Sequence, residues 1–487
     1  MIEDIIYFFQ YYVFFYATLI IVGTVTLTVM SYIGIRRYKW RFTKKEDKIL
    51  KESPFVPGVS VIAPAYNEEK TIIANVRSML TLDYPLFEVV IVNDGSTDKT
   101  LDLLIDEYQL VETSFAYIEK IKTRPFRRVL KSTDPRYQKL TIVDKENGGT
   151  KADATNAGIN ASVFPYFLCT DVDCILSRDA LTKMIQPVLN SSTQVIAVGA
   201  TMRMANSCEI NENGVITRVR PPLRIVPCFQ EIEYLRSYLV SKMGWSFINA
   251  VPNVSGGLGL FDKSVAVEAG GYDPVSHAED MDMLLRMMAY MRDYKKKYKV
   301  AYIPVTTCWT EGPPNLSVLN KQRTRWGQGL MQMFVVHRKF LFNPKYGRTG
   351  LITLPYVFLF EFLAPVIEVT GFIVFIFLLL TGRINFETAY VIFGYIYLIG
   401  VTISSIAIAI DLSVDKLYNK FREYIKLVLF SLVEVVLYHP FIVFFSLKGY
   451  VNFLLSRRLE WGAMKRQGFD QSRNNPPGNV VPEKVAL

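Results

Sequence analysis

The hydrophobic residues of this chain are concentrated at its two ends, and a more polar stretch separates them. Residues 5–35 are almost wholly apolar or aromatic, and apolar residues dominate again in 351–380, 389–410 and 424–447. A helix of about 20 apolar residues crosses the hydrocarbon core of a membrane. The pattern therefore predicts an N-terminal anchor and C-terminal membrane helices. Because 351–380 is too long for one upright span, we expect an interfacial helix followed by a span there.

Short apolar runs alternate with helical patterns inside the polar stretch. The runs at 59–64, 87–92 and 140–143 predict buried strands, and residues 72–80 and 99–108 carry apolar positions at helical spacing. Strands that alternate with helices form a parallel, doubly wound sheet. The middle of the chain is therefore predicted to be an α/β domain.

The rest of the polar stretch shows weaker periodicity. Residues 111–140 are expected to be an irregular excursion, 201–250 to be rich in loops, and 295–299 to be a solvated run of charge. Asn67 is expected to cap the first helix of the domain, since asparagine is favoured at helix N-caps. A Met-rich helix is expected over 281–291.

Basic residues flank the apolar segments and predict the topology. The cluster after the first apolar run lies where a cleaved signal peptide would have its cleavage site, so we expect a retained anchor with a cytoplasmic flank. The loop 411–423 and the tail 457–487 are also basic, although a simple count of spans puts the tail outside. Three arrangements remain open: the tail lies on the inner face, 351–380 crosses twice, or 424–447 re-enters.

Composition narrows the classes of function. The 487 residues are 50% hydrophobic and carry a net charge of +10, which the basic flanks of membrane spans explain, and no nucleic-acid-binding motif accompanies it. The three His residues lack metal spacing, which argues against a zinc site. The five scattered Cys residues are expected to be small buried residues in a reducing compartment.

Polar residues at the expected strand ends are the first candidates for chemistry. Asp171 and Asp173 follow the apolar run 163–168, and alternate residues of a strand point to the same side. Paired carboxylates suit Mg²⁺ or Mn²⁺, although a solvated strand end or turn is the alternative. Tyr66 and Asp94 also follow expected strands, and ligands of such sheets bind at this edge.

Two further motifs point to a phosphate and a sugar. Lys151 follows a Gly pair at an expected helix start, a geometry that suits a phosphate but lacks Walker spacing; a plain helix start is the alternative. Gln322, Arg325 and Trp326 share one face of a predicted helix. Arginine binds diphosphate oxygens and tryptophan offers a platform for a sugar ring, while a surface helix with a buried Trp is the alternative.

In chain order, these motifs resemble those of the membrane-bound family 2 glycosyltransferases, which include cellulose, chitin, hyaluronan and poly-N-acetylglucosamine synthases. The residues that carry the resemblance are Pro64–Glu68, Asn93–Ser96, Lys151, Asp171–Asp173, Glu279–Asp280 and Gln322–Trp326. The resemblance implies an α/β GT-A domain, Rossmann-like with a mixed, mostly parallel sheet, that faces the cytoplasm between transmembrane helices. The expected parts are an anchor (1–35), a linker (36–57), the GT-A domain (58–345, interface helix 315–340), membrane helices (346–456) and a tail (457–487).

The resemblance also implies roles for individual residues. Asp280 would be the general base on the acceptor hydroxyl, Asp173 would ligate Mg²⁺ or Mn²⁺, and Trp326 would contact the acceptor sugar. The remaining positions would bind the UDP-sugar. The nucleoside would be held by Tyr66, Glu68 and Asp94, and Lys151 and Asp171 would lie near the ribose or diphosphate. The diphosphate would also contact Gln322 and Arg325, and Glu279 would lie beside the general base. Ala278 stands where the family usually has Thr, which leaves the choice of acceptor open.

The expected function is therefore inverting transfer from UDP-GlcNAc or UDP-Glc to a growing glycan, with export across the cell membrane and a possible export subunit as partner. A membrane enzyme that adds a single sugar to a lipid or short acceptor is the nearest alternative. A non-catalytic membrane scaffold is a third hypothesis, and intact Asp173 and Asp280 argue against it.

Overall fold

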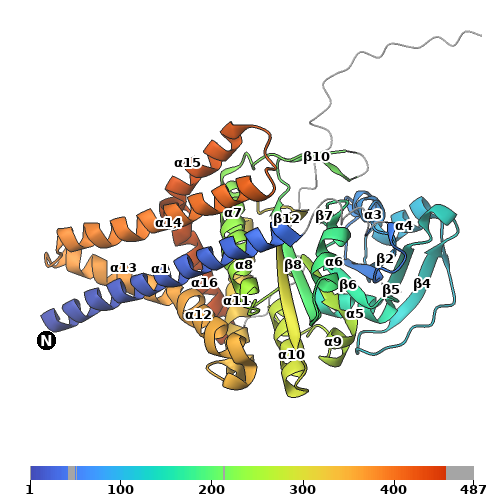
Figure 1. Ribbon diagram of the computed structural model, residues 1–487, viewed down its shortest axis with the longest axis horizontal. Coiled ribbons are helices and arrows are strands. Elements are labelled where there is room, and N and C mark those ends of the chain that lie inside the picture. Colours follow the sequence, from blue (N-terminus) through green and yellow to red (C-terminus); the bar gives the residue numbers. More distant parts are fainter. Residues whose placement is uncertain (1, 42–49, 51, 212–213, 457–487) are drawn as a thin grey trace, which may run out of the picture.

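A computed structural model describes residues 2–41, 50, 52–211 and 214–456. Its first element is the long helix α1 (Ile2–Arg41), which extends to one end of the molecule together with helices of the C-terminal third (Figure 1). The helix continues past the expected end of the anchor at residue 35, so the first basic residues of the expected linker are helical. The expected tail, 457–487, lies outside the described residues.

A mixed sheet of ten strands forms the centre of the described part of the chain. Its order is β3-β4-β5-β2-β1-β6-β11-β8-β12-β7. The strands that share one direction are β1 (Val59–Ala65), β2 (Phe87–Asp94), β3 (Leu110–Glu112), β5 (Leu140–Lys145), β6 (Tyr166–Thr170), β8 (Gln194–Met204) and β12 (Tyr298–Thr310). Those that run against them are β4 (Phe126–Ser132), β7 (Ile175–Leu176) and β11 (Leu258–Asp262). The expected mixed, mostly parallel sheet is confirmed.

Helices cover the sheet, and a short hairpin of β9 (Glu209–Ile210) and β10 (Ile216–Arg218) lies outside it. The helices of this domain are α3 (Ile72–Leu80), α4 (Thr100–Tyr108), η1 (Pro135–Tyr137), α5 (Lys151–Ala161), α6 (Ala180–Leu189), α9 (Lys263–Glu268) and α10 (Glu279–Asp293). Helix α5 packs closely on the sheet because it is built mostly of small residues. A Cβ at Gly158 would lie 2.3 Å from the side chain of Ile62.

The structure departs from four local predictions, wholly or in part. The excursion 111–140 contains β4. The charge run is exposed over 295–297, as expected, but β12 begins at Tyr298 within it. The region 201–250, expected to be rich in loops, contains the helices α7 (Ile225–Leu235), the π-helical η2 (Arg236–Lys242) and α8 (Met243–Phe247). Pairing within the sheet overrides weak local preference in β4.

The fourth error concerns Asn67, which does not cap a helix. It adopts a left-handed φ of 55°, while α3 begins only at Ile72. Its side-chain oxygen accepts a hydrogen bond of 2.8 Å from the backbone of Thr97. A short amide side chain tolerates this backbone region and bonds to nearby peptide groups, so Asn67 joins the loops after β1 and β2.

The C-terminal third returns to long apolar helices. After α11 (Leu316–Val336) come η3 (Arg338–Phe340), η4 (Pro344–Tyr346), η5 (Thr349–Thr353), α12 (Leu354–Val357), η6 (Phe358–Phe362), α13 (Ala364–Leu380), α14 (Phe386–Val414), α15 (Phe421–Leu437) and α16 (His439–Leu454). The described residues contain three helical segments that are long and apolar enough to cross a membrane: Tyr11–Trp40, Thr349–Leu380 and Phe386–Val414. The bent pair α15–α16, at 51°, forms a broken span or a re-entrant loop.

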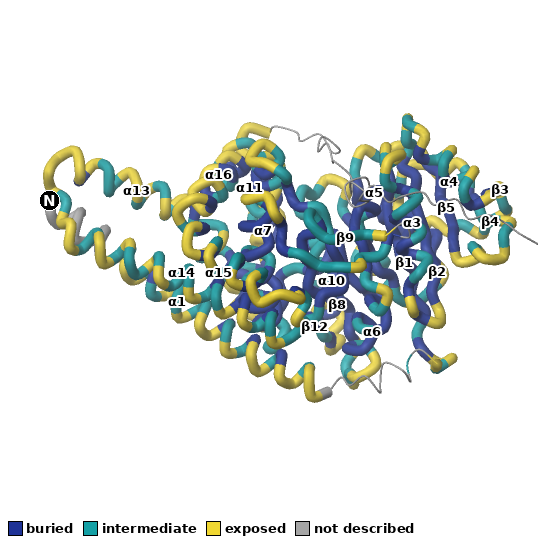
Figure 2. The backbone as a smooth tube through the Cα atoms, turned by 90° about the horizontal axis from the view of Figure 1, so that it is seen from above, coloured by how far each residue is buried: buried dark blue, intermediate teal, exposed yellow. Residues whose placement is uncertain are grey.

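Burial separates the two parts of the molecule. Buried residues are concentrated in the sheet and the helices on it, whereas α1, α13 and α14 carry many exposed residues (Figure 2). Large apolar side chains are among them, such as Phe372, Leu380 and Tyr390, which are 61%, 81% and 73% exposed. An exposed apolar surface of this extent is typical of helices that face lipid.

Candidate active site

The two aspartates after β6 lie in a turn, which corrects the expectation of a strand tip. The strand starts at Tyr166, after Pro165, which has no N–H for the ladder, and it ends at Thr170. The backbone N–H of Cys174 then donates to the carbonyl of Asp171 over 3.0 Å. This turn brings potential ligand atoms of Asp171, Asp173 and Cys174 within 4.8 Å of one another. The carboxylates are therefore close together, as expected, but with a thiol beside them.

Lys151 lies opposite this turn, at the first residue of α5. Its ammonium group forms an ion pair with Asp171 and donates a hydrogen bond of 2.7 Å to the carbonyl of Gly256. Burial alone would lower the pKa of Lys151, but the charges of Asp171 and Glu279 and the hydrogen bond to Asp171 act against it, so the pKa is raised. Lys151 is therefore a permanent cation that joins α5 to the metal-ligand candidates.

Asp280 bonds to the same residue through its N–H. Its Oδ2 accepts a hydrogen bond of 3.0 Å from the N–H of Gly256, so Gly256 lies between Lys151 and Asp280. The backbone of the loop 254–259 is thus held by two protein side chains at Gly256. Burial and the neighbouring Asp280 raise the pKa of Glu279, while Arg325 and Lys151 oppose the rise. Three charged side chains, those of Lys151, Glu279 and Asp280, therefore lie around Gly256.

Asp94 is fully buried at the end of β2. One carboxylate oxygen accepts hydrogen bonds from Lys145 (2.7 Å) and from the backbone of Gly148 (3.0 Å). The other, Oδ2, is buried and has no hydrogen-bond partner among the described residues. Such an oxygen is costly unless a ligand satisfies it. The sequence analysis did not single out Lys145, which also pairs with Asp153 at 2.6 Å, although Lys145 follows an apolar run just as Asp94 does.

Tyr66 and Glu68 follow β1 and lie near the same edge of the sheet. Tyr66 is half-buried. The backbone N–H of Glu68 donates to the hydroxyl of Thr100 over 2.8 Å, and its carboxylate accepts from the hydroxyl of Thr71 over 3.0 Å. Glu68 therefore also organises the start of α3.

Helix α11 presents the three residues expected to share a face. Arg325 acts electrostatically on Glu279 and His277, and its buried Nε has no hydrogen-bond partner among the described residues. Gln322 accepts a hydrogen bond of 2.9 Å from Gln230. Trp326 is 38% exposed, which excludes the alternative of a buried Trp. Arginine and indole are thus available at the edge of the site.

Arg323, between these residues, holds the helix in place. Its guanidinium donates to both carboxylate oxygens of Glu233 at 2.6 Å each, and it lies 4.3 Å from the centre of the Trp326 ring. One face of the indole is therefore covered by a cation that is itself fixed to α7. Farther along α11, a Cβ at Gly329 would lie only 2.9 Å from Cβ of Ala278, so α11 packs directly on the segment that leads into α10.

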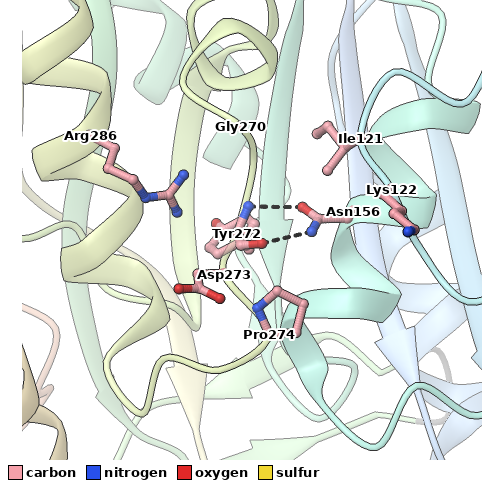
Figure 3. A pocket seen from close by; sticks show the side chains of 8 residues that line it. All are labelled: Ile121, Lys122, Asn156, Gly270, Tyr272, Asp273, Pro274 and Arg286. Carbon is pink, nitrogen blue, oxygen red and sulfur yellow. Dashed lines mark hydrogen bonds between the residues drawn. The ribbon is translucent and has the colours of Figure 1, made fainter. Parts of the chain in front are cut away.

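A second link joins α5 to this segment. The side chain of Asn156 donates to the carbonyl of Tyr272 and accepts from its N–H, both over 2.8 Å (Figure 3). A cavity of about 300 Å³ lies beside this pair, with Arg286 and Lys122 on its wall. Arg286 donates hydrogen bonds to the carbonyls of Ala269 and Gly271, so it stabilises the loop before Asp280.

The sequence analysis also missed an aromatic and basic row on α7 and η2. Tyr234 and Tyr238 lie edge to face at 5.2 Å, and the ammonium of Lys242 is 4.7 Å from the Tyr238 ring. Burial lowers the pKa of Lys242 to about 8, against the charges of Asp280 and Glu361. The spacing of four residues was visible in the sequence, but this region was expected to be loop-rich.

The chain is similar in sequence to known glycosyltransferases. The model of glycosyl transferase family 2 matches residues 60–213, and that of glycosyl transferase family group 2 matches 229–403. Poly-beta-1,6-N-acetyl-D-glucosamine synthase of Staphylococcus aureus (strain COL) is 27% identical over 326 residues, which are 67% of this chain and 65% of that protein. The synthase of the same name from Staphylococcus epidermidis is 27% identical over 388 residues, 76% of this chain and 81% of that protein.

A solved structure of the mannosyltransferase PcManGT from Pyrobaculum calidifontis, in complex with GDP-Man and Mn²⁺, is 18% identical and has a TM-score of 0.46. The match covers 90% of this chain and 99% of that one. The chain spans 65% of the length of the S. aureus synthase. The two family models and the synthase relatives therefore identify family 2 glycosyltransferase domains in residues 60–213 and 229–403 of this chain.

Proposed function

We propose that this protein transfers a sugar from a UDP-sugar, UDP-GlcNAc or UDP-Glc, to the end of a growing β-linked polysaccharide, with inversion at the anomeric carbon. The observation that carries the proposal is that Lys151 bonds to the carbonyl and Asp280 to the N–H of the same residue, Gly256. Lys151 is at the same time paired with Asp171. This arrangement sets a cation for a diphosphate within reach of a carboxylate for an acceptor hydroxyl. The names of the S. aureus and S. epidermidis relatives favour UDP-GlcNAc.

The donor would bind across the carboxyl edge of the sheet. The buried, unsatisfied Oδ2 of Asp94 would accept a hydrogen bond from the nucleoside, next to Tyr66 and Glu68. The buried Nε of Arg325 would donate to the diphosphate, together with Gln322. An unsatisfied acceptor and an unsatisfied donor are the groups that a ligand with a base and a phosphate would complete.

A divalent cation fits the same place. Carboxylate oxygens are the ligands that Mg²⁺ and Mn²⁺ prefer, and the turn brings the carboxylates of Asp171 and Asp173 within 4.8 Å of each other. Asp173 would hold the ion, which would supply positive charge to the leaving diphosphate.

Asp280 would act as the general base. As the acceptor hydroxyl oxygen forms a bond to the anomeric carbon, its proton passes to the Asp280 carboxylate, and the bond between that carbon and the β-phosphate oxygen breaks. UDP leaves with the electron pair, and Lys151 and Arg325 stabilise its added negative charge. Attack from the side opposite to the leaving group inverts the configuration. The N–H of Gly256 would keep the carboxylate oriented throughout.

Elongation is supported by the acceptor side of the site. Trp326 offers one exposed face for a sugar, because Arg323 covers the other. The long apolar helices follow α11 directly in the chain, so a growing glycan would have an adjacent route across the membrane. We place the catalytic domain in the cytoplasm and the chain in the cell membrane as a multi-pass protein, with an export subunit as a possible partner; the basic flank of α1 supports this orientation.

The test is a panel of UDP-sugars given to the purified full-length chain with Mg²⁺ or Mn²⁺. We expect UDP release with UDP-GlcNAc or UDP-Glc and radiolabelled products of many lengths on a gel. Single-sugar addition to a lipid would replace elongation by the simpler transferase activity. No UDP release with any donor would contradict enzymatic function and favour a scaffold.

A further inference from the structure

A second cavity lies on the membrane side of the molecule, apart from the proposed active site. It has a volume of about 550 Å³ and lies between the middle of α1, the end of α8 and the segment η5–α12. Its walls are mostly apolar or aromatic, with Leu27, Met30, Trp245 and Tyr356 among them. A volume of this size is within the range of about 300–1,000 Å³ that accommodates small ligands.

The closed end of this cavity lies deep along α1. A Cβ at Gly23 would lie 2.7 Å from the ring of Tyr356, so α1 and α12 touch there. Trp245 packs against the same tyrosine, ring edge to ring face at 5.2 Å. Both α1 and the Thr349–Leu380 segment are candidate membrane spans. The cavity is therefore an apolar slot at membrane depth.

The other end of the cavity is basic. Arg348, which lines it, is exposed and donates a hydrogen bond of 2.8 Å to the carbonyl of Ile248. Arg37 lies 4.8 Å from the ring of Phe247, which also lines the cavity. No acidic side chain among the described residues forms an ion pair with Arg37 or Arg348. Two arginines thus flank the end of α8 with donors left for an anion.

We propose that this cavity binds an anionic phospholipid, with an acyl chain between α1 and α12 and the phosphate beside Arg348 and Arg37. Basic pockets between membrane helices on the cytoplasmic side recognise anionic headgroups, and guanidinium groups bind phosphate oxygens in forked geometry. From Met30 to Arg37 the helix rises by about 10 Å. The apolar part of the cavity and its basic end therefore follow each other along α1, as the acyl chain and the headgroup follow each other in a lipid. The proposal rests on the membrane location proposed above.

The test reconstitutes the full-length chain in nanodiscs of equal parts phosphatidylglycerol and phosphatidylcholine, then releases it in detergent and counts retained lipids by native mass spectrometry. Wild type is expected to retain phosphatidylglycerol preferentially. Arg348→Gln should reduce that preference about fivefold, because one basic group near the headgroup is lost. Arg348→Lys should keep part of it. Arg338→Gln, at an exposed arginine that does not line the cavity, is the matched control and should behave as wild type.

A second pair of variants tests the acyl-chain slot. Thr26→Trp fills the cavity, whereas Thr18→Trp adds the same ring to α1 away from it. We expect only Thr26→Trp to lose both lipids. Equal retention of the two lipids by wild type, or no difference within either variant pair, would overturn the lipid site. Failure of wild type to float with liposomes after an alkaline wash would instead contradict the membrane location.

Discussion

The carboxylate of Asp282 lies 2.6 Å from Nε2 of His337, at the end of α11. Its second oxygen accepts two hydrogen bonds from Arg286, one turn farther along α10. Asp280, only two residues earlier, points instead to Gly256. Asp280 and Asp282 therefore have different roles: Asp282 holds α10 against the end of α11, and Asp280 belongs to the proposed active site.

Asp282→Asn should lower the stability of the domain by about 1.5–3 kcal/mol, the usual contribution of hydrogen bonds to a charged group. Burial raises the pKa of Asp282, but the hydrogen bonds and charges of His337 and Arg286 together lower it by more than burial raises it. The net shift of this pKa is therefore downward. The stabilisation is then complete above the ordinary carboxyl pKa of about 3.9 and is lost as pH falls through the lower folded value. Thermal unfolding in detergent at several pH values measures it.

The matched control is Asp293→Asn on the same helix. Asp293 forms an exposed ion pair with Lys345, and such pairs contribute little to stability. We expect its melting temperature to match wild type at every pH. A gap between wild type and Asp282→Asn that widens in acid would contradict the assignment.

Asp280→Asn should slow sugar transfer about 10²–10⁴-fold while UDP affinity stays near that of wild type. An asparagine oxygen can still accept the hydrogen bond from Gly256, so the loop that holds Lys151 is preserved. UDP titration and turnover with the same preparation separate the two effects. Equal losses in affinity and rate would assign Asp280 to the donor.

Asp173→Asn should abolish metal-dependent turnover in a protein that still folds and inserts. The reason is the loss of the proposed carboxylate ligand beside the Lys151–Asp171 pair. Turnover is measured against Mn²⁺ and Mg²⁺ concentration. The control is Asp179→Asn, at a partly exposed aspartate that follows β7 in the sequence. Unchanged metal dependence in Asp173→Asn would contradict the assignment.

Trp326→Ala should shorten the product far more than it reduces hydrolysis of the donor by water. An aromatic platform contributes about 0.5–1.5 kcal/mol beyond buried area, and a misplaced acceptor costs roughly 10²-fold more. Trp326→Phe keeps a ring over Arg323 and should retain most chain synthesis. Product length on gels, beside UDP release without acceptor, is the measurement. Equal losses in both activities would place Trp326 on the donor side.

A cytoplasmic catalytic domain predicts that Asp106→Cys resists labelling by an impermeant thiol reagent in intact cells. Asp106 is an exposed residue of α4, so the same variant should react readily once the cells are opened. Four of the five native cysteines are buried, and Cys208 is half-buried, so a Cys208→Ser background removes the one accessible competitor. Ready labelling of intact cells would reverse the proposed topology.

Local sequence was sufficient for much of the site because position along an element is a local property. Apolar runs followed by a polar residue located the ends of β1, β2 and β6, and hence Asp94 and Asp171. A Gly pair and a polar start located the first turn of α5 and Lys151. Parallel strands bring such ends to one edge of a sheet, so these residues were expected to lie together.

The partners of these residues could be found only in the tertiary structure. Lys151 bonds to Gly256, 105 residues away, and Arg203 of β8 is buried against Asp411, 208 residues away on α14. No periodicity marks such pairs, because they depend on which strand and helix ends the sheet order brings together. The same applies to β4, whose basic residues favour strands weakly.

The sequence by itself therefore determined the layout of the chain, its family resemblance and the residues that end the central strands. Only the tertiary structure decided that Asp280 and Lys151 both bond to the backbone of Gly256. It also decided that Asp282 contacts His337, and that α1 and α12 leave a cavity with Arg348 at its edge. The physical reason is that hydrophobic patterning specifies which face of each element is buried, whereas side-chain partners follow from the packing of several elements at once.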